Sequence, residues 1–99
     1  MVTLNVKSIS GEAETIKELL AGGLEEEKRR IKFAVEMSVS KIKKYEEKYG
    51  ISTSAFIEKF RNKEIEENDE TFNWWAEEKL LNELKEKLSI IENIEICQP

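Results

Sequence analysis

The stretch "TFNWWAEEKL", residues 71–80, places Trp74 and Trp75 side by side in a short, polar chain. A tryptophan side chain carries about 150–250 Å² of mostly apolar surface, which is costly to expose to water. Consecutive residues of a helix point about 100° apart, so one packed face cannot take both rings. Either the two rings pack against different helices of this chain, or Trp75 is reserved for another molecule.

The pattern around these tryptophans predicts a last helix from about Thr71 to Ile91. Its apolar seam repeats about every seven residues, as in a coiled coil, at Trp74, Leu81, Leu84, Leu88 and Ile91. Trp75 lies off this seam, beside Phe72. The first turn of the helix is therefore apolar on two faces, and we expect it to lie between two surfaces.

A charged connector, "RNKEIEENDE" at residues 61–70, precedes this helix, and Asn68 or Asp69 can cap the helix start. Before the connector the sequence predicts a short helix that is capped by Ser52 or Thr53. The apolar face of the short helix consists of Phe56, Ile57 and Phe60.

A long helix is predicted from about Leu24 to Tyr49, and Gly50 ends it because glycine accepts the left-handed backbone found past a helix C-terminus. Its core-facing residues are Leu24, Ile31, Ala34, Val35, Ser38, Ile42, Tyr45 and Tyr49. Phe33 and Met37, four residues apart, form a second apolar spot on nearly the opposite side. An isolated monomer has little use for that spot, so it predicts a contact with another helix or chain.

The opening "MVTLNVKSI", residues 1–9, has the period of a half-buried strand. Val2, Leu4 and Val6 share one side, and Thr3, Asn5 and Lys7 share the other. The sequence offers no second convincing strand, and a lone strand leaves its backbone groups unpaired. We therefore expect a homodimer whose contacts are Leu4, Val6, Phe33 and Met37.

Between strand and long helix, Ser10 caps a short helix through Ala21, and Gly22-Gly23 ends it. The predicted fold is mainly α, with one short N-terminal strand, paired in a dimer, followed by about four helices. This outline resembles a ribbon-helix-helix dimer with a C-terminal helical extension. Residues 1–50 would form the strand-helix-helix dimerisation region, and residues 51–99 an acidic helical partner-binding region.

The ribbon-helix-helix outline implies a two-stranded ribbon that enters the major groove of DNA. The residues facing the bases would be Thr3, Asn5 and Lys7. Against this, three glutamates at residues 25–27 occupy the helix start where that fold contacts a phosphate, and they repel it. Arg29, Arg30 and Lys32 offset part of that repulsion. Operator DNA is thus a candidate partner against which the three glutamates argue.

Residue types that carry catalysis are scarce in this sequence. There is no histidine, so the usual general base and metal ligand are missing, and a Ser–Lys pair is the remaining catalytic alternative. One cysteine, Cys97, cannot build a zinc site, and the acidic connector lacks the oxygen spacing of a calcium loop. We expect no enzymatic activity, no cofactor and no metal.

Composition and charge place the chain in a broad class. Its 99 residues suit one small domain, and the longest apolar runs are three residues, so we expect no membrane span. A single cysteine favours the cytoplasm, and richness in Lys, Glu and Ile suits a thermophile. Residues 50–99 carry six Lys and Arg against twelve Asp and Glu. That acidic half favours a basic partner, or else is a solvated surface.

The segment "KKYEEKYGISTSAFIEKFRNKEIEENDETFNWWAEEKLLNELKEKL", residues 43–88, resembles the C-terminal half of a group of short prokaryotic proteins regarded as antitoxins of type II toxin–antitoxin systems. The matching features are Tyr45, Tyr49-Gly50, a capping Ser or Thr, Phe56, Phe60, the acidic connector and the aromatic start of the last helix. The resemblance implies a non-enzymatic protein that binds and neutralises a cognate toxin, often an RNase, and commonly also its own operator.

The candidate partner-binding residues are Phe72, Trp74, Trp75, Leu81 and Leu88. The alternative function is a small helical scaffold or assembly subunit with no toxin partner, in which the aromatic residues serve self-association only.

Overall fold

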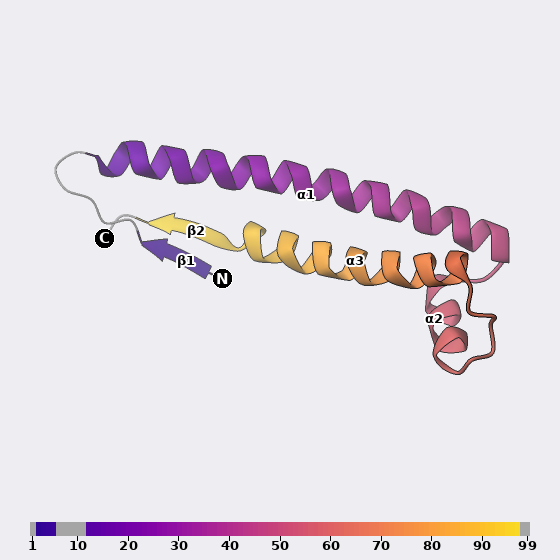
Figure 1. Ribbon diagram of the computed structural model, residues 1–99. Coiled ribbons are helices and arrows are strands. Elements are labelled where there is room, and N and C mark those ends of the chain that lie inside the picture. Colours follow the sequence, from indigo (N-terminus) through magenta and orange to yellow (C-terminus); the bar gives the residue numbers. More distant parts are fainter. Residues whose placement is uncertain (1, 6–11, 98–99) are drawn as a thin grey trace. The chain divides into compact units, whose positions relative to one another are not determined.

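The computed structural model describes residues 2–5 and 12–97. Within these residues the elements follow in the order β1 (Val2–Asn5), α1 (Ala13–Tyr49), α2 (Thr53–Arg61), α3 (Asp69–Glu92) and β2 (Ile94–Cys97) (Figure 1). The chain divides into two compact units, which we call the terminal unit (residues 1–33 and 85–99) and the central unit (residues 34–84). The predicted division at residue 50 falls inside the central unit.

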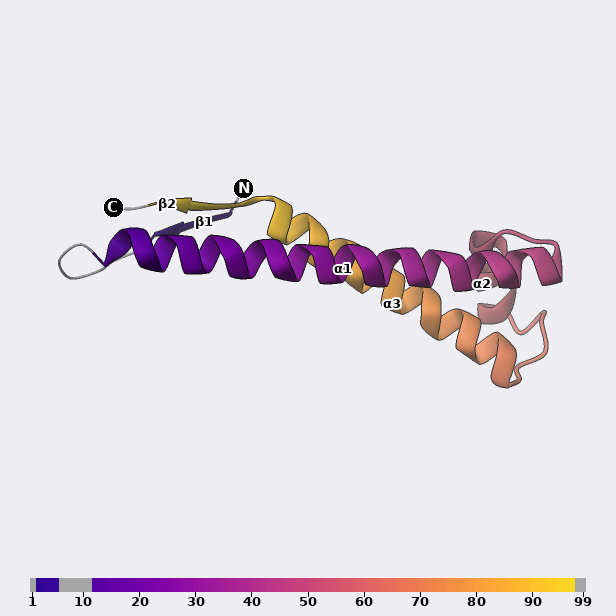
Figure 2. The ribbon, with the colours of Figure 1, turned by 90° about the horizontal axis from the view of Figure 1, so that it is seen from above.

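In the terminal unit, β1 and β2 lie side by side in both views and pair in parallel, with Val2 opposite Ile94 and Asn5 opposite Cys97 (Figures 1 and 2). The expectation that β1 finds its partner only in a second copy is therefore wrong. Ile94 and Ile96 alternate with a glutamate, as in a strand, but four residues directly after a helix are too short a signal to stand out in the sequence.

The two N-terminal helices of the prediction are a single helix, α1, which continues through Gly22 and Gly23. Glycine in a helix interior costs only about 0.5–1 kcal/mol relative to alanine, and the flanking Glu, Leu and Lys residues favour helix. The ribbon-helix-helix-like fold with about four helices is thus wrong: the described residues contain three helices, and β1 pairs within the chain.

The continuity of α1 also removes the expected phosphate site, because no helix starts at Leu24. Glu26 and Glu27 lie in the interior of α1 and form ion pairs with Arg29 and Arg30, each 2.5 Å between nitrogen and oxygen. Backbone N–H groups in a helix interior are bonded to carbonyls of the preceding turn and are not free to bind a phosphate.

The central unit has an aromatic core to which the last part of α1, α2 and the first part of α3 contribute (Figure 1). Trp74 and Phe56 are completely buried, and their rings stack with centroids 3.8 Å apart and planes 4° apart. Tyr45 and Tyr49 of α1 contact Trp74 at centroid distances of 5.6 and 5.4 Å. Ile42 and Leu81 complete the buried cluster. One tryptophan thus joins all three helices of the unit.

A chain of hydrogen bonds crosses the same three helices. The Trp74 Nε1–H donates to Thr53 Oγ1 at 3.1 Å, and the Thr53 hydroxyl donates to Glu46 Oε2 at 2.8 Å. The Thr53 backbone N–H donates to the same Glu46 oxygen at 2.7 Å. The only polar atom of the buried indole is therefore satisfied, which matters because an unpaired buried donor is costly.

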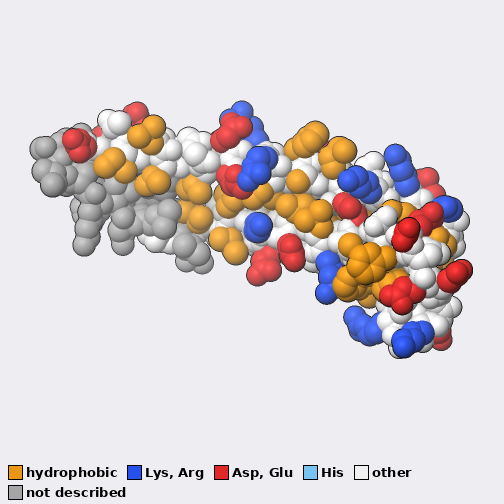
Figure 3. Space-filling view, viewed as in Figure 1, with side chains coloured by type: hydrophobic (Ala, Val, Ile, Leu, Met, Phe, Trp, Pro, Cys, Tyr) orange, Lys and Arg blue, Asp and Glu red, His pale blue; other side chains and the backbone are white. Residues whose placement is uncertain are grey.

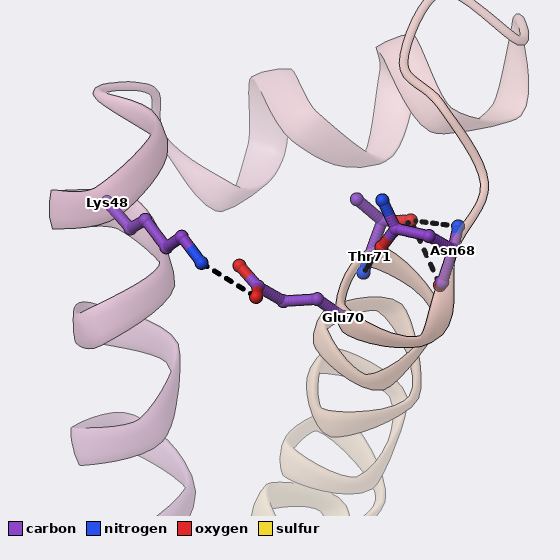
Figure 4. Close-up of polar contacts among 4 residues, drawn as sticks. All are labelled: Lys48, Asn68, Glu70 and Thr71. Atoms are coloured by element: carbon purple, nitrogen blue, oxygen red, sulfur yellow. Dashed lines mark hydrogen bonds and ion pairs between the residues drawn. The ribbon is translucent and has the colours of Figure 1, made fainter.

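Local signals determine where these helices begin and end. Gly50, at φ 67°, ends α1 as predicted. Ser52, one of the two predicted caps, accepts a hydrogen bond from the Ala55 N–H at 3.1 Å at the start of α2. Asn68 caps α3: its Oδ1 accepts from the Thr71 N–H, and its own N–H donates to Thr71 Oγ1, both at 2.9 Å (Figure 4).

The ion pair between Lys48 and Glu70 joins the end of α1 to the first turn of α3, with Nζ and Oε2 2.7 Å apart (Figure 4). The hydrogen bond from Lys48 lowers the pKa of the Glu70 carboxyl, and the same bond raises the pKa of the Lys48 ammonium. The Lys48 side chain is exposed, so solvent screens the pair, and it stabilises the fold only modestly.

Candidate functional site

The two neighbouring tryptophans occupy different environments in the central unit. Trp74 is interior, whereas Trp75 is only half-buried. Trp75 packs against Phe60 of α2, with centroids 6.2 Å apart, and against Phe72 at 5.5 Å. Phe72 itself is 49% exposed. Phe60, Phe72 and Trp75 therefore form an aromatic cluster at the surface, directly beside the core that holds Trp74.

A groove of about 690 Å³ lies beside Trp75 and is lined by α2 and α3. The residues from α2 and its end are Ser54, Ile57, Glu58, Arg61 and Asn62, and those from α3 are Trp75, Glu78, Lys79 and Asn82. The α3 set follows the spacing i, i+3, i+4, i+7, and the α2 set has the same spacing with Asn62 added at i+8, so each set is one face of a helix over about two turns. The groove is thus lined by one face of α2 and one face of α3.

The groove is apolar in part and charged along both walls. The Lys79 ammonium lies over the Trp75 ring, 4.5 Å from its centroid. The ion pairs found in the described residues join Arg29 to Glu26, Arg30 to Glu27, and Lys48 to Glu70, and none of these six side chains lines the groove. Figure 3 shows hydrophobic side chains exposed over the first half of α3, with charged side chains of both signs around them.

No family model, curated protein or solved structure matches this chain. What the site does is therefore inferred from its own geometry.

The structure distributes the predicted partner-binding residues between core and surface. Trp74 and Leu81 are buried, so they support the surface from beneath and do not reach a partner. Phe72 and Trp75 are accessible. Leu88, in the terminal unit, is half-buried. Of the residues predicted to bind a partner at the start of α3, Phe72 and Trp75 are therefore the ones that remain candidates.

The predicted dimer and DNA contacts have a different outcome. Phe33 and Met37 are 64% and 47% exposed on α1. Thr3 is exposed, and Leu4 and Asn5 lie in β1. Val6 and Lys7 lie outside the described residues. Because β1 pairs with β2 of the same chain, β1 no longer needs a strand of a second copy, which was the reason for predicting the ribbon between two chains.

The groove was not predicted from the sequence. Its α2 wall is a regular i, i+3, i+4, i+7 face, but two of its members, Glu58 and Arg61, are charged, and a hydrophobic pattern search passes over them. In residues 2–5 and 12–97, no helix combines the length and apolar character needed to cross a bilayer. The same part of the chain holds no cluster of three or more His, Cys, Asp or Glu side chains suited to a metal ion.

Proposed function

We propose that this chain is a non-enzymatic, antitoxin-like protein that binds and neutralises a basic toxin, of the RNase type, through the aromatic surface of its central unit. The observation that carries the proposal is the unequal burial of two adjacent tryptophans. Trp74 is fully buried in the core, whereas the rings of Trp75 and Phe72 remain accessible beside a groove. Aromatic residues that are rigidly held and partly exposed are the residues that dominate protein–protein affinity.

Charge supports a basic partner. The connector between α2 and α3, residues 62–68, carries three glutamates and one lysine, and Asp69 and Glu70 follow in the first turn of α3. An acidic arc next to an aromatic patch attracts a positively charged protein from a distance and speeds its association. Nucleic acid, which is itself negative, is repelled by the same arc. The proposed partner is therefore a protein.

Self-association stays part of the proposal on a narrower basis. Strand pairing no longer supports a homodimer, because β1 pairs with β2 of the same chain. The remaining support is the exposure of Phe33 and Met37. Two exposed apolar side chains four residues apart on α1 lie on one side of the helix and offer a contact to a second copy. The proposed setting is the cytoplasm.

The test is binding to the product of the neighbouring gene, measured by calorimetry with the purified full chain. The double variant Phe72→Ala with Trp75→Ala should weaken binding by roughly tenfold to a hundredfold and abolish rescue of toxin-arrested growth, since such anchors contribute about 2 kcal/mol or more. Leu80→Ala is the matched control, because Leu80 is also an exposed apolar residue of α3, at 44%.

Stability separates the two tryptophans in the same experiment. Trp74→Ala should cost about 3–5 kcal/mol of the free energy of unfolding, whereas Trp75→Ala should cost much less because its ring is only half-buried. Undiminished binding by a well-folded Phe72→Ala, Trp75→Ala variant would contradict the proposal. A stable oligomer that binds no neighbouring product would favour the scaffold function instead.

A further inference from the structure

We infer that two copies of this chain associate through their α1 helices, which run antiparallel and meet along one exposed face of each helix. This contact is a specific form of the self-association in the proposed function, on which it rests, and it needs no toxin partner. Two features of α1 support it: a seam of exposed residues, and the match between that seam and its own reverse.

The exposed seam lies on α1 away from its buried residues. Its members are spaced alternately by four and three residues, as in the seam of a coiled coil: Leu19, Gly23, Glu26, Arg30, Phe33 and Met37. At about 100° per residue, all six lie within about 40° of one line along the helix. The buried Ile31 and Ile42 lie about 120–140° from that line. The side chains of Leu19, Phe33 and Met37 are 71%, 64% and 47% exposed, so the described part of the chain leaves the seam uncovered.

The seam is complementary to its own reverse. In a pair related by a two-fold axis, residue i of one copy contacts residue j of the other, and j contacts i. With the axis level with Lys28, the antiparallel partners are Leu19 with Met37, Gly23 with Phe33, and Glu26 with Arg30. These pairings join two apolar side chains, a glycine and a large ring, and an acid and a base.

Gly23 leaves room for the other copy. Apart from the neighbouring backbone of α1 itself, a Cβ at Gly23 would have no atom within 4 Å, so the surrounding described residues do not require a glycine. A second helix does, because the Phe33 ring of the other copy lies against this position and the missing side chain lets it approach the backbone closely.

The charges determine the direction of pairing. In a parallel pair Glu26 would face Glu26 and Arg30 would face Arg30, and like charges in contact are unfavourable. The antiparallel pair places Glu26 against Arg30 twice. Within one chain these residues already pair with Arg29 and Glu27 at the surface. A carboxylate has two oxygens and a guanidinium has five N–H groups, so each can add a partner from the other copy.

The exposed apolar residues determine the register. An alternative antiparallel register, in which Phe33 meets Met37 of the other copy, leaves Leu19 beyond the end of the other α1. The register centred at Lys28 covers all three apolar side chains and therefore buries more apolar surface. Its contact is about 27 Å long on a helix about 10–12 Å wide. This is smaller than a standard interface, so we expect a dissociation constant of roughly 10–100 μM.

The experiment exchanges the two seam charges and measures self-association of the full chain by sedimentation equilibrium at low salt. Glu26→Arg and Arg30→Glu, each alone, bring like charges together twice and should weaken the dimer at least about tenfold. The variant with both exchanges restores opposite charges and should associate within about threefold of the wild type. Glu18→Arg is the matched control, because Glu18 is exposed on α1 but lies off the seam. It changes the net charge as Glu26→Arg does, and it should not weaken the dimer.

Disulfide cross-linking tests the register without relying on charge. In a Cys97→Ser background, Leu19→Cys with Met37→Cys should give a covalent dimer on mild oxidation. Phe33→Cys with Met37→Cys should not, because this pair reports the alternative register. Circular dichroism accompanies every variant, and if a charge exchange unfolds α1, the cross-linking decides.

The outcomes separate this contact from the rest of the proposed function. Weakening by the single exchanges, its reversal by the double exchange, and cross-linking of residues 19 and 37 support the antiparallel pair. A double exchange that associates no better than the single ones, or cross-linking through residues 33 and 37 alone, overturns this pair and leaves a homodimer standing. A wild-type chain that stays monomeric at about 500 μM, well above the expected dissociation constant, removes self-association altogether. Toxin binding through Phe72 and Trp75 is decided separately, by the calorimetry described above.

Discussion

The indole N–H of Trp74 donates a hydrogen bond to the hydroxyl of Thr53, 3.1 Å away, inside the core of the central unit. Thr53 in turn donates to Glu46, so a residue of each helix in the unit belongs to one hydrogen-bonded chain. These buried polar groups favour one packing arrangement of the three helices, because an arrangement that separates Trp74 from Thr53 leaves the indole N–H without an acceptor.

The first prediction concerns that hydroxyl. Thr53→Val keeps the shape of the side chain but leaves the buried Trp74 N–H without a partner, so it should lower the free energy of unfolding by about 1–3 kcal/mol in chemical denaturation. Thr53→Ser keeps the hydroxyl and serves as the control, with a smaller loss. Equal stability of the valine and serine variants would show that the hydrogen bond contributes nothing.

The second prediction tests whether α1 is continuous. Apart from the neighbouring backbone of α1 itself, a Cβ at Gly22 or Gly23 would have no atom within 4 Å, and both glycines lie inside the helix. Gly22→Ala and Gly23→Ala should each raise the free energy of unfolding by about 0.5–1 kcal/mol. Gly50→Ala should lower it by about 1–2 kcal/mol, because Gly50 has φ 67°. A destabilised Gly22→Ala or Gly23→Ala variant would instead indicate a helix end at these residues.

The third prediction concerns Lys63, a non-glycine residue with φ 58° after the end of α2. The Glu64 N–H donates to the Lys59 carbonyl at 2.8 Å and the Lys63 N–H to the Phe60 carbonyl at 3.2 Å, which is a Schellman motif with lysine where glycine is usual. Lys63→Gly should stabilise the protein by up to about 1 kcal/mol, since relief of the left-handed strain exceeds the added flexibility of the unfolded chain. Lys63→Ala keeps the Cβ and should bring no gain in thermal stability.

The fourth prediction is a pH dependence of the Lys48–Glu70 pair. The bond from Lys48 holds the pKa of Glu70 below 4.5, so the stabilisation is present above that value and is lost as the pH falls through the lowered pKa. The pKa of Lys48 is raised above 10.5, so its share is present below that value and is lost as the pH rises through the raised pKa.

Glu70→Gln removes the pair, and the difference in Tm between wild type and this variant should therefore be largest between these two limits and shrink on either side. Glu67→Gln, on the connector that precedes α3, controls for the loss of one negative charge. A Tm difference that is the same at all pH values would exclude the ion pair as its source.

Local signals in the sequence located most helix boundaries. Gly50, Ser52 and Asn68 mark ends that the structure confirms, because capping hydrogen bonds and left-handed glycines act within three or four residues along the chain. The seven-residue repeat likewise identified Trp74 and Leu81 as members of a packed seam, and both are buried. Such patterns depend on a geometry that repeats every turn of a helix, so they can be recognised without knowledge of the fold.

Only the tertiary structure decided the pairing of β1 with β2, the passage of α1 through Gly22 and Gly23, and the different burial of Trp74 and Trp75. Val2 and Ile94 lie at opposite ends of the chain, and no local pattern records which strand another will meet. The helix propensity of a glycine pair differs from that of other residues by only a small free energy. Packing can therefore decide whether the helix ends or continues there. The two rings differ in burial because α2 places Phe56 against one of them and leaves a groove beside the other.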